Sequence, residues 1–207
     1  MRLTNFIILV VAAGLGITAV SCGHKDKFIG TWTAISPANI TNLLPAASTA
    51  TSLTTMQLMP AGSNDTPGSV CLSSLIDITQ PVDPAAGSFD QPYEVSVAAT
   101  ASVCGTWHYK GNEDDELLLS LDLNSITVTV DPAGVTYTEN LLTGKQQPQL
   151  DSLTAATAAL WKKQLTAAMR QEFGRFAVLD DIEVNRDGFL SLEIQSPDTE
   201  LHFRRSE

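Results

Sequence analysis

Residues 117–130, with the sequence LLLSLDLNSITVTV, decide the fold class of this chain. Leucine stands at every second position of 117–123, with Ser120 and Asp122 between the later leucines. The apolar residues of 126–130 alternate with threonine in the same way. Because successive side chains point to opposite faces of a strand, this two-residue period predicts two strands that are each buried on one side. Asn124-Ser125 between them predicts a tight hairpin.

Similar segments on both sides extend the pattern to an antiparallel meander. Further strands are predicted over 28–33, 71–79, 93–97, 105–109, 135–138, 177–184 and 189–195, and around Leu201 and Phe203. Turns are predicted at Asp131–Gly134 and Asn185–Gly188. One helix, 153–173, interrupts the strands near the C-terminal end, capped by Asp151 or Ser152 and stopped by Gly174. The segment 34–68 has no convincing period and is expected to be irregular.

The N-terminal segment predicts where the protein resides. Arg2 precedes an apolar run over 6–20, and Ala19-Val20-Ser21 leads into Cys22. A run this short behind a basic start is typical of a secretory signal. The cysteine after small residues is typical of a bacterial lipobox, in which cleavage leaves an acylated Cys22. An ordinary signal with an incidental cysteine is the alternative.

These boundaries predict a signal peptide at 1–21, a lipidated tether at 22–27 and one folded domain at 28–207. Residues 1–21 carry one arginine, so the mature chain would have 11 basic and 23 acidic residues and a net charge of −12. This charge argues against nucleic acid or an anionic membrane surface as the primary partner. We expect a protein of the bacterial cell envelope, anchored by lipid at the outer membrane, in a leaflet that the sequence leaves undecided.

If Cys22 is acylated, Cys71 and Cys104 remain as an even pair. In an oxidising compartment such a pair most simply forms a disulfide. The bridge would close a loop of 34 residues, which the chain-entropy model values at about 4 kcal/mol. A redox or metal role is the alternative, but the two cysteines do not form a Cys-x-x-Cys motif and no histidine-rich segment accompanies them.

Two short motifs resemble those of a known family. Gly30-Thr31-Trp32 resembles the Gly-x-Trp that opens lipocalins, and Gly105-Thr106-Trp107 resembles a second motif of lipocalin-like lipoproteins from Bacteroidetes. Together with the lipobox and the strand pattern, they make the mature chain similar to that family. The chain departs from lipocalins because at least two predicted strands follow the helix.

The resemblance implies an antiparallel up-and-down barrel or a strongly curved sheet, lipocalin-like, with one helix near the C-terminal end. An eight-stranded barrel has room for side chains or for one small ligand. The loop after the first lipocalin strand acts as a lid, so residues 34–68 would either cover a cavity or cap a filled core. The expected ligand-binding residues are Trp32, Leu43, Leu44, Met56, Leu58, Met59, Trp107 and Tyr109.

No motif in the sequence predicts catalysis, a metal or a cofactor. Glu113–Glu116 could bind calcium, although four consecutive acidic residues more often form a solvated hairpin tip. We therefore expect a non-enzymatic protein. The leading hypothesis is a lipid-anchored envelope protein that holds a small apolar or amphipathic ligand in its barrel. The alternative is a structural or interaction module whose filled barrel docks onto an envelope partner.

Overall fold

The computed structural model describes residues 27–60, 67–83, 92–110, 115–138, 147–195 and 197–206. The predicted signal peptide, Cys22 and the tether as far as Asp26 lie outside the described residues, as do Glu113 and Asp114. Within the described part the chain is mainly β, with one α-helix near its C-terminal end, as predicted.

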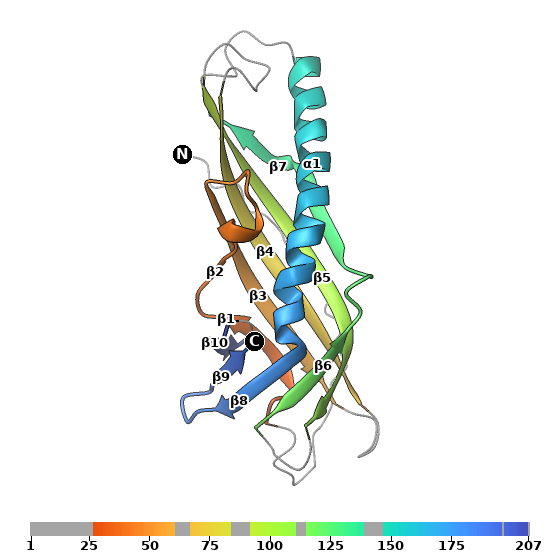
Figure 1. Ribbon diagram of the computed structural model, residues 1–207, viewed down its shortest axis with the longest axis vertical. Coiled ribbons are helices and arrows are strands. Elements are labelled where there is room, and N and C mark those ends of the chain that lie inside the picture. Colours follow the sequence, from red (N-terminus) through yellow and green to blue (C-terminus); the bar gives the residue numbers. More distant parts are fainter. Residues whose placement is uncertain are drawn as a thin grey trace.

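Eight strands form a closed antiparallel barrel (Figure 1). Each barrel strand pairs with the next one along the chain, and the last pairs with the first, so the topology is up-and-down. This confirms the predicted fold class. In order around the ring the strands are β1 (Gly30–Ala34), β3 (Thr49–Met59), β4 (Gly68–Val82), β5 (Tyr93–Tyr109), β6 (Leu117–Leu121), β8 (Val178–Val184), β9 (Phe189–Ile194) and β10 (Thr199–Arg205).

Above the closed barrel, the sheet opens. The 17-residue strand β5 pairs with β6 over its last five residues and with β7 (Thr127–Tyr137) over its first part. The short β2 (Ala38–Asn39) pairs with β3 on the opposite side. The upper half is therefore an open curved sheet that continues the barrel wall, as Figure 1 shows.

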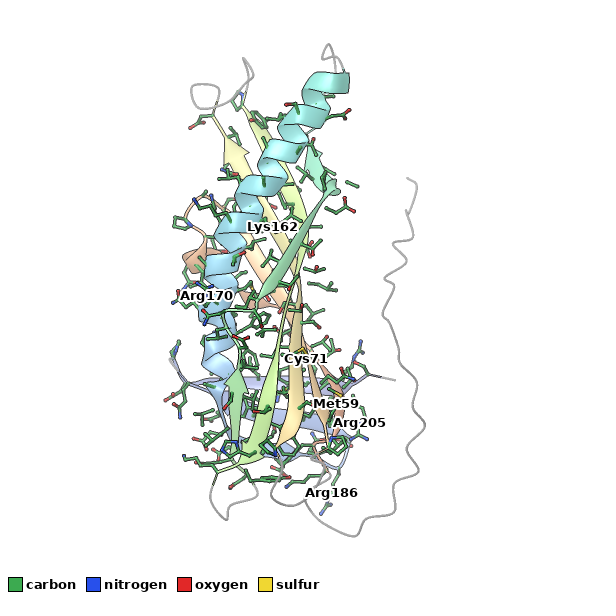
Figure 2. All side chains as sticks on the ribbon, turned by 90° about the vertical axis from the view of Figure 1, so that its right-hand side faces the viewer. Met59, Cys71, Lys162, Arg170, Arg186 and Arg205 are labelled. Carbon is green, nitrogen blue, oxygen red and sulfur yellow. A yellow bond between two sulfur atoms is a disulfide. The ribbon has the colours of Figure 1, made fainter. Side chains whose placement is uncertain are left out.

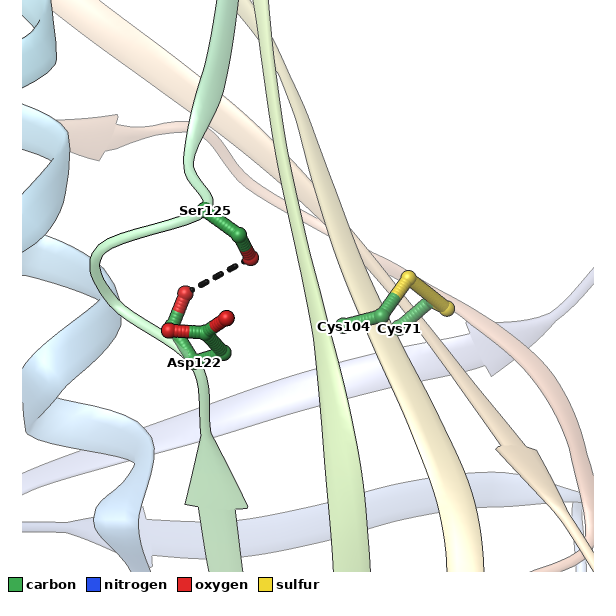
Figure 3. The surroundings of a disulfide bond; sticks show 4 residues. All are labelled: Cys71, Cys104, Asp122 and Ser125. Atoms are coloured by element: carbon green, nitrogen blue, oxygen red, sulfur yellow. Dashed lines mark hydrogen bonds between the residues drawn. A yellow bond between two sulfur atoms is a disulfide. The ribbon is translucent and has the colours of Figure 1, made fainter.

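Two of the predicted turns are wrong. Strands β6 and β7 both pair with β5, one below the other, so Asn124-Ser125 does not join a hairpin. The chain instead makes a short excursion between collinear strands, held where the Ser125 hydroxyl donates to the Asp122 carbonyl at 2.9 Å (Figure 3). Residues 131–134 lie inside β7 and form a bulge opposite Ala98. The pattern of a strand does not specify which neighbour it pairs with, and here a long β5 serves both.

The prediction that 34–68 is irregular is also wrong. Strand β3 occupies Thr49–Met59 and pairs with β4 over its whole length. The remaining part, 35–48, contains β2 and a 3-10 turn at Thr41–Leu43. It is pinned to the sheet where the Thr41 hydroxyl accepts from the Ala50 amide at 2.8 Å. Ile40 and Leu44 of this segment are buried against the core.

The helix α1 (Gln147–Gly174) begins six residues before the predicted start at 153, so neither Asp151 nor Ser152 caps it. It packs lengthwise against β7 and β5. Trp161, Leu165 and Met169 on its inner face are fully buried in the core, and Leu160 points to solvent. A 3-10 turn at Arg175–Ala177 leads from the helix into β8. None of the described helices is long and apolar enough to cross a membrane.

The predicted disulfide between Cys71 and Cys104 is confirmed. The two residues stand directly opposite each other on β4 and β5, with their Cα atoms 4.1 Å apart. Figure 3 shows the bridge between the two strands. The side chain of Cys104 is exposed and that of Cys71 half-buried, so the bridge lies on the outer face of the barrel wall.

The hairpin predicted at Asn185–Gly188 is present between β8 and β9. The Asn185 amide donates to the Phe189 carbonyl at 2.9 Å, and Gly188 has a φ of 80°. Glycine adopts this left-handed conformation at no steric cost, which explains its position in the turn.

Candidate functional site

The expected ligand-binding residues fall into two groups. Six of them lie at the lower, closed end of the barrel, around an aromatic cluster that we define as Phe28, Trp32, Trp107 and Tyr109. The rings of Phe28 and Tyr109 are 6.4 Å apart, and those of Trp107 and Tyr109 meet edge to face at 5.6 Å.

The polar atoms of both tryptophans are already used by the chain. The Trp32 indole N–H donates to the Phe28 carbonyl at 2.8 Å. The Trp107 indole N–H donates to the Met59 carbonyl at 2.9 Å. Neither indole therefore has a free hydrogen-bond donor to offer a ligand.

Met56 and Leu58 complete this lower group. Met56 stands opposite Trp32 on the neighbouring strand, and both side chains are fully buried. Leu58 is buried as well, whereas Met59 is only partly so. These side chains pack as part of the hydrophobic core.

Leu43 and Leu44 form the second group and lie elsewhere. They belong to the segment 35–48, which covers the upper sheet, and they lie near Ala50 of β3. Ala50 is six residues from Met56 along β3, about 20 Å at the usual rise of a strand. The eight residues therefore do not surround one common space.

Gly68 permits the close approach of Trp107. A Cβ atom at position 68 would lie 2.2 Å from the Trp107 indole nitrogen and 2.6 Å from the Met59 carbonyl oxygen. Only glycine leaves room for the indole and its hydrogen bond at this point. The sequence gives no sign of this, because the two residues are far apart along the chain.

Arg205 lies at the lower end of the barrel, against the Trp32 ring. Its guanidinium lies 4.8 Å from the centre of the Trp32 ring and donates to the Ile29 carbonyl at 3.0 Å. The Lys27 ammonium lies 4.6 Å from the centre of the Phe28 ring. Cations held over aromatic faces are stabilised by the ring quadrupole. The positive charges of Lys27 and Arg205 thus lie beside the aromatic rings of the first described residues.

Between the two groups lies a layer of small and polar side chains that sequence reasoning missed. Ser52, Thr54 and Ser74 are buried, and the Thr54 and Ser74 hydroxyls share a hydrogen bond of 2.9 Å. The Ser52 hydroxyl and the Trp161 indole N–H, also buried, have no hydrogen-bond partner among the described residues. Buried polar groups normally have one.

One pocket lies outside the barrel, at the C-terminal end of α1. It measures about 290 Å³ and is lined by Gln171, Gly174, Arg175, Ala177, Val178 and Gln195. Arg175 is held by the buried Glu172 at 3.2 Å and by the Thr199 hydroxyl at 2.9 Å. Its charge is therefore compensated within the protein.

The described residues include no group of three or more histidine, cysteine, aspartate or glutamate side chains that could hold a metal ion. Of the acidic stretch predicted to be a hairpin tip, Glu116 forms an ion pair with Lys110 at 2.6 Å and Asp115 is exposed. His108 and His202 lie exposed on different strands, β5 and β10.

At the upper end of the sheet, burial raises the pKa of Tyr93 above 10.0, and the nearby Tyr137 adds to the effect. The two rings are 6.2 Å apart. The Tyr137 hydroxyl donates to Thr157 of α1 at 3.3 Å, which ties the helix to β7. The tyrosines therefore contribute to packing at this end.

Comparison of the chain with protein-family models, with curated proteins and with solved structures finds no significant match.

Proposed function

We propose that the chain is a lipid-anchored protein of the bacterial cell envelope, acylated on Cys22. Its filled barrel serves as an interaction module and does not enclose a ligand. One observation carries the proposal: the interior positions expected to hold a ligand are occupied by the protein's own side chains. Trp32 is 1% exposed, Met56 0% and Trp107 4%. A barrel of eight strands has an interior just wide enough for such filling.

The outer face of β3, β4 and β5 supports the same proposal. Leu75 of β4 is 45% exposed, and the half-buried Leu53 stands opposite it on β3. The next row across these strands consists of Thr55, Ser73 and Ser102. The row on the other side contains Thr51 and the exposed Asp77. An apolar centre with a polar rim is typical of a protein–protein interface.

Two measurements on the full-length protein, produced in a bacterium that processes lipoproteins, test the proposal. The intact mass is expected to show acylation, lost in Cys22→Ser. The native mass after removal of detergent is expected to equal the acylated chain alone. An additional mass that denaturation releases would contradict the filled-barrel proposal and favour ligand binding.

A photo-crosslinking residue placed at position 75 in cells tests the outer face. A discrete adduct is expected there, and none at position 159 on the exposed side of α1, which serves as the matched control. Equal adducts at both positions, or none at 75, would argue against docking through this face.

Ligand binding in the barrel is the second candidate, because two interior polar atoms are unsatisfied. The Ser52 hydroxyl and the Trp161 indole N–H could hydrogen-bond to the polar group of an amphipathic ligand if α1 moved outward. A bound compound whose occupancy falls severalfold in Trp161→Phe would support this candidate. The resemblance to lipocalins favours it, and the burial of Trp32 and Met56 favours the interaction module.

A further inference from the structure

The lower end of the barrel carries a group of positive charges on an otherwise acidic protein. Lys27, Arg186, Arg204 and Arg205 form this group, which we call the basic rim. Arg205 lies against Trp32, and Arg204 stands opposite Phe189 of β9. Figure 2 shows Arg186 and Arg205 at the lower end, far from Lys162 of α1.

No ion pair joins a rim cation to a carboxylate among the described residues. Asp187 lies in the same turn as Arg186, so these five residues together have a formal charge of +3. The complete chain has a net charge of −11. The rim therefore differs in sign from the molecule as a whole.

Phe189 adds an aromatic side chain to the rim. It is 37% exposed, although its position opposite Arg204 would allow a smaller or polar residue. Surfaces that lie at the boundary between water and lipid combine Lys or Arg with apolar side chains such as Phe.

The position of the predicted anchor decides which partner meets the rim. Six residue steps separate Cys22 from Phe28, and an extended chain spans at most about 3.5 Å per residue, so the two lie within about 20 Å. Electrostatic attraction to a membrane acts within a Debye length, about 8 Å under physiological conditions. An acyl chain on Cys22 would thus hold the rim within reach of the membrane surface, where attraction acts once the rim comes within a Debye length.

We infer that the basic rim rests on the anionic lipid headgroups of the membrane, with Arg186 and Arg204 at phosphate groups and Phe189 at the interface. This inference rests on the acylation of Cys22 proposed above. The rim sets the orientation of the anchored barrel, and it leaves the acidic remainder and the outer face around Leu75 turned away from the lipid for a protein partner.

The test uses the acylated full-length protein in vesicles that contain phosphatidylglycerol, with a trace of a photoactivatable phosphatidylglycerol. Mass spectrometry of the digested protein locates the lipid adducts. Adducts are expected in the rim segments 185–190 and 203–206 and not in the α1 segment 152–171. In Arg186→Glu/Arg204→Glu the rim adducts are expected to fall at least about fivefold, the effect of one cation at a membrane surface.

Lys162→Glu/Lys163→Glu is the matched control, because it reverses two equally exposed charges on α1. This control is expected to keep the rim adducts unchanged. Adducts spread evenly over rim and helix, or an equal loss in both double variants, would overturn the inference. A chain that lacks the acyl mass would overturn the proposed function first, and the intact mass distinguishes that result from a rim that does not meet lipid.

Discussion

Replacing both Cys71 and Cys104 by serine removes the cross-link between β4 and β5 and little else. Cys104 is exposed and Cys71 half-buried on the outer face, so the substitution changes buried area only slightly. The bridge closes a loop between residues 33 positions apart. The chain-entropy model then predicts a loss of about 4 kcal/mol in the free energy of unfolding, equivalent to roughly 10 °C in Tm for a domain of this size.

Urea unfolding followed by circular dichroism measures this loss, with the midpoint and the slope m determined for both proteins. The matched control is Ser73→Ala/Ser102→Ala, because these residues face each other two positions further along the same strands. It removes a similar side-chain pair without a cross-link, and it is expected to change the unfolding free energy by less than about 0.5 kcal/mol. A loss below about 1 kcal/mol in the cysteine variant, or a similar loss in the control, would refute the argument.

Three further substitutions test the interior. Gly68→Ala is expected to destabilise the fold by about 2–4 kcal/mol in thermal or urea unfolding, because its Cβ would displace the Trp107 indole, and a loss under 1 kcal/mol would contradict that geometry. Thr54→Val is expected to cost about 1–3 kcal/mol, since it leaves the Ser74 hydroxyl buried without its partner, and adding Ser74→Ala should recover part of the loss. Tyr93 keeps its proton to higher pH in the folded state than in the unfolded chain, so stability should fall as pH rises above about 10. Tyr93→Phe should reduce that fall, and an unchanged profile would count against the burial of this hydroxyl.

The strands with apolar inner faces were predictable from the sequence, and β3 was not. Alternation is visible when one face is apolar and the other polar. On β3 the inner face includes Ser52 and Thr54, which are as polar as the outer threonines, so the period is hidden. Because Ser52 and Thr54 stand where a buried strand face usually has apolar residues, the sequence pattern reveals neither β3 nor the buried polar layer.

The start of the helix was missed for a different reason. Asp151 and Ser152 are typical caps, but α1 already includes both, and the helix begins at Gln147. Packing of the inner face against β7 determines the length of the helix more than local capping does.

For the candidate site, the sequence indicated residues that the structure buries, such as Trp32, but it placed Met56 in an irregular covering segment and not on a strand of the barrel. It could not indicate which of them share a space. Leu44 lies near Ala50 of β3, and Met56 lies six residues further along that strand. The position of β3 along the barrel is set by its register with β4. Contacts such as that of Gly68 with Trp107 depend on the same register.

Strand β5 belongs to both halves of the molecule. Its ladder with β4 runs through 15 residue pairs, from the open sheet under α1 into the closed barrel, without an interruption. If β5 leaves the sheet in one half of the molecule, the other half loses its part of the same strand. The two halves should therefore unfold as a single cooperative unit. Cleavage sites in both halves should become accessible to a protease at the same rate.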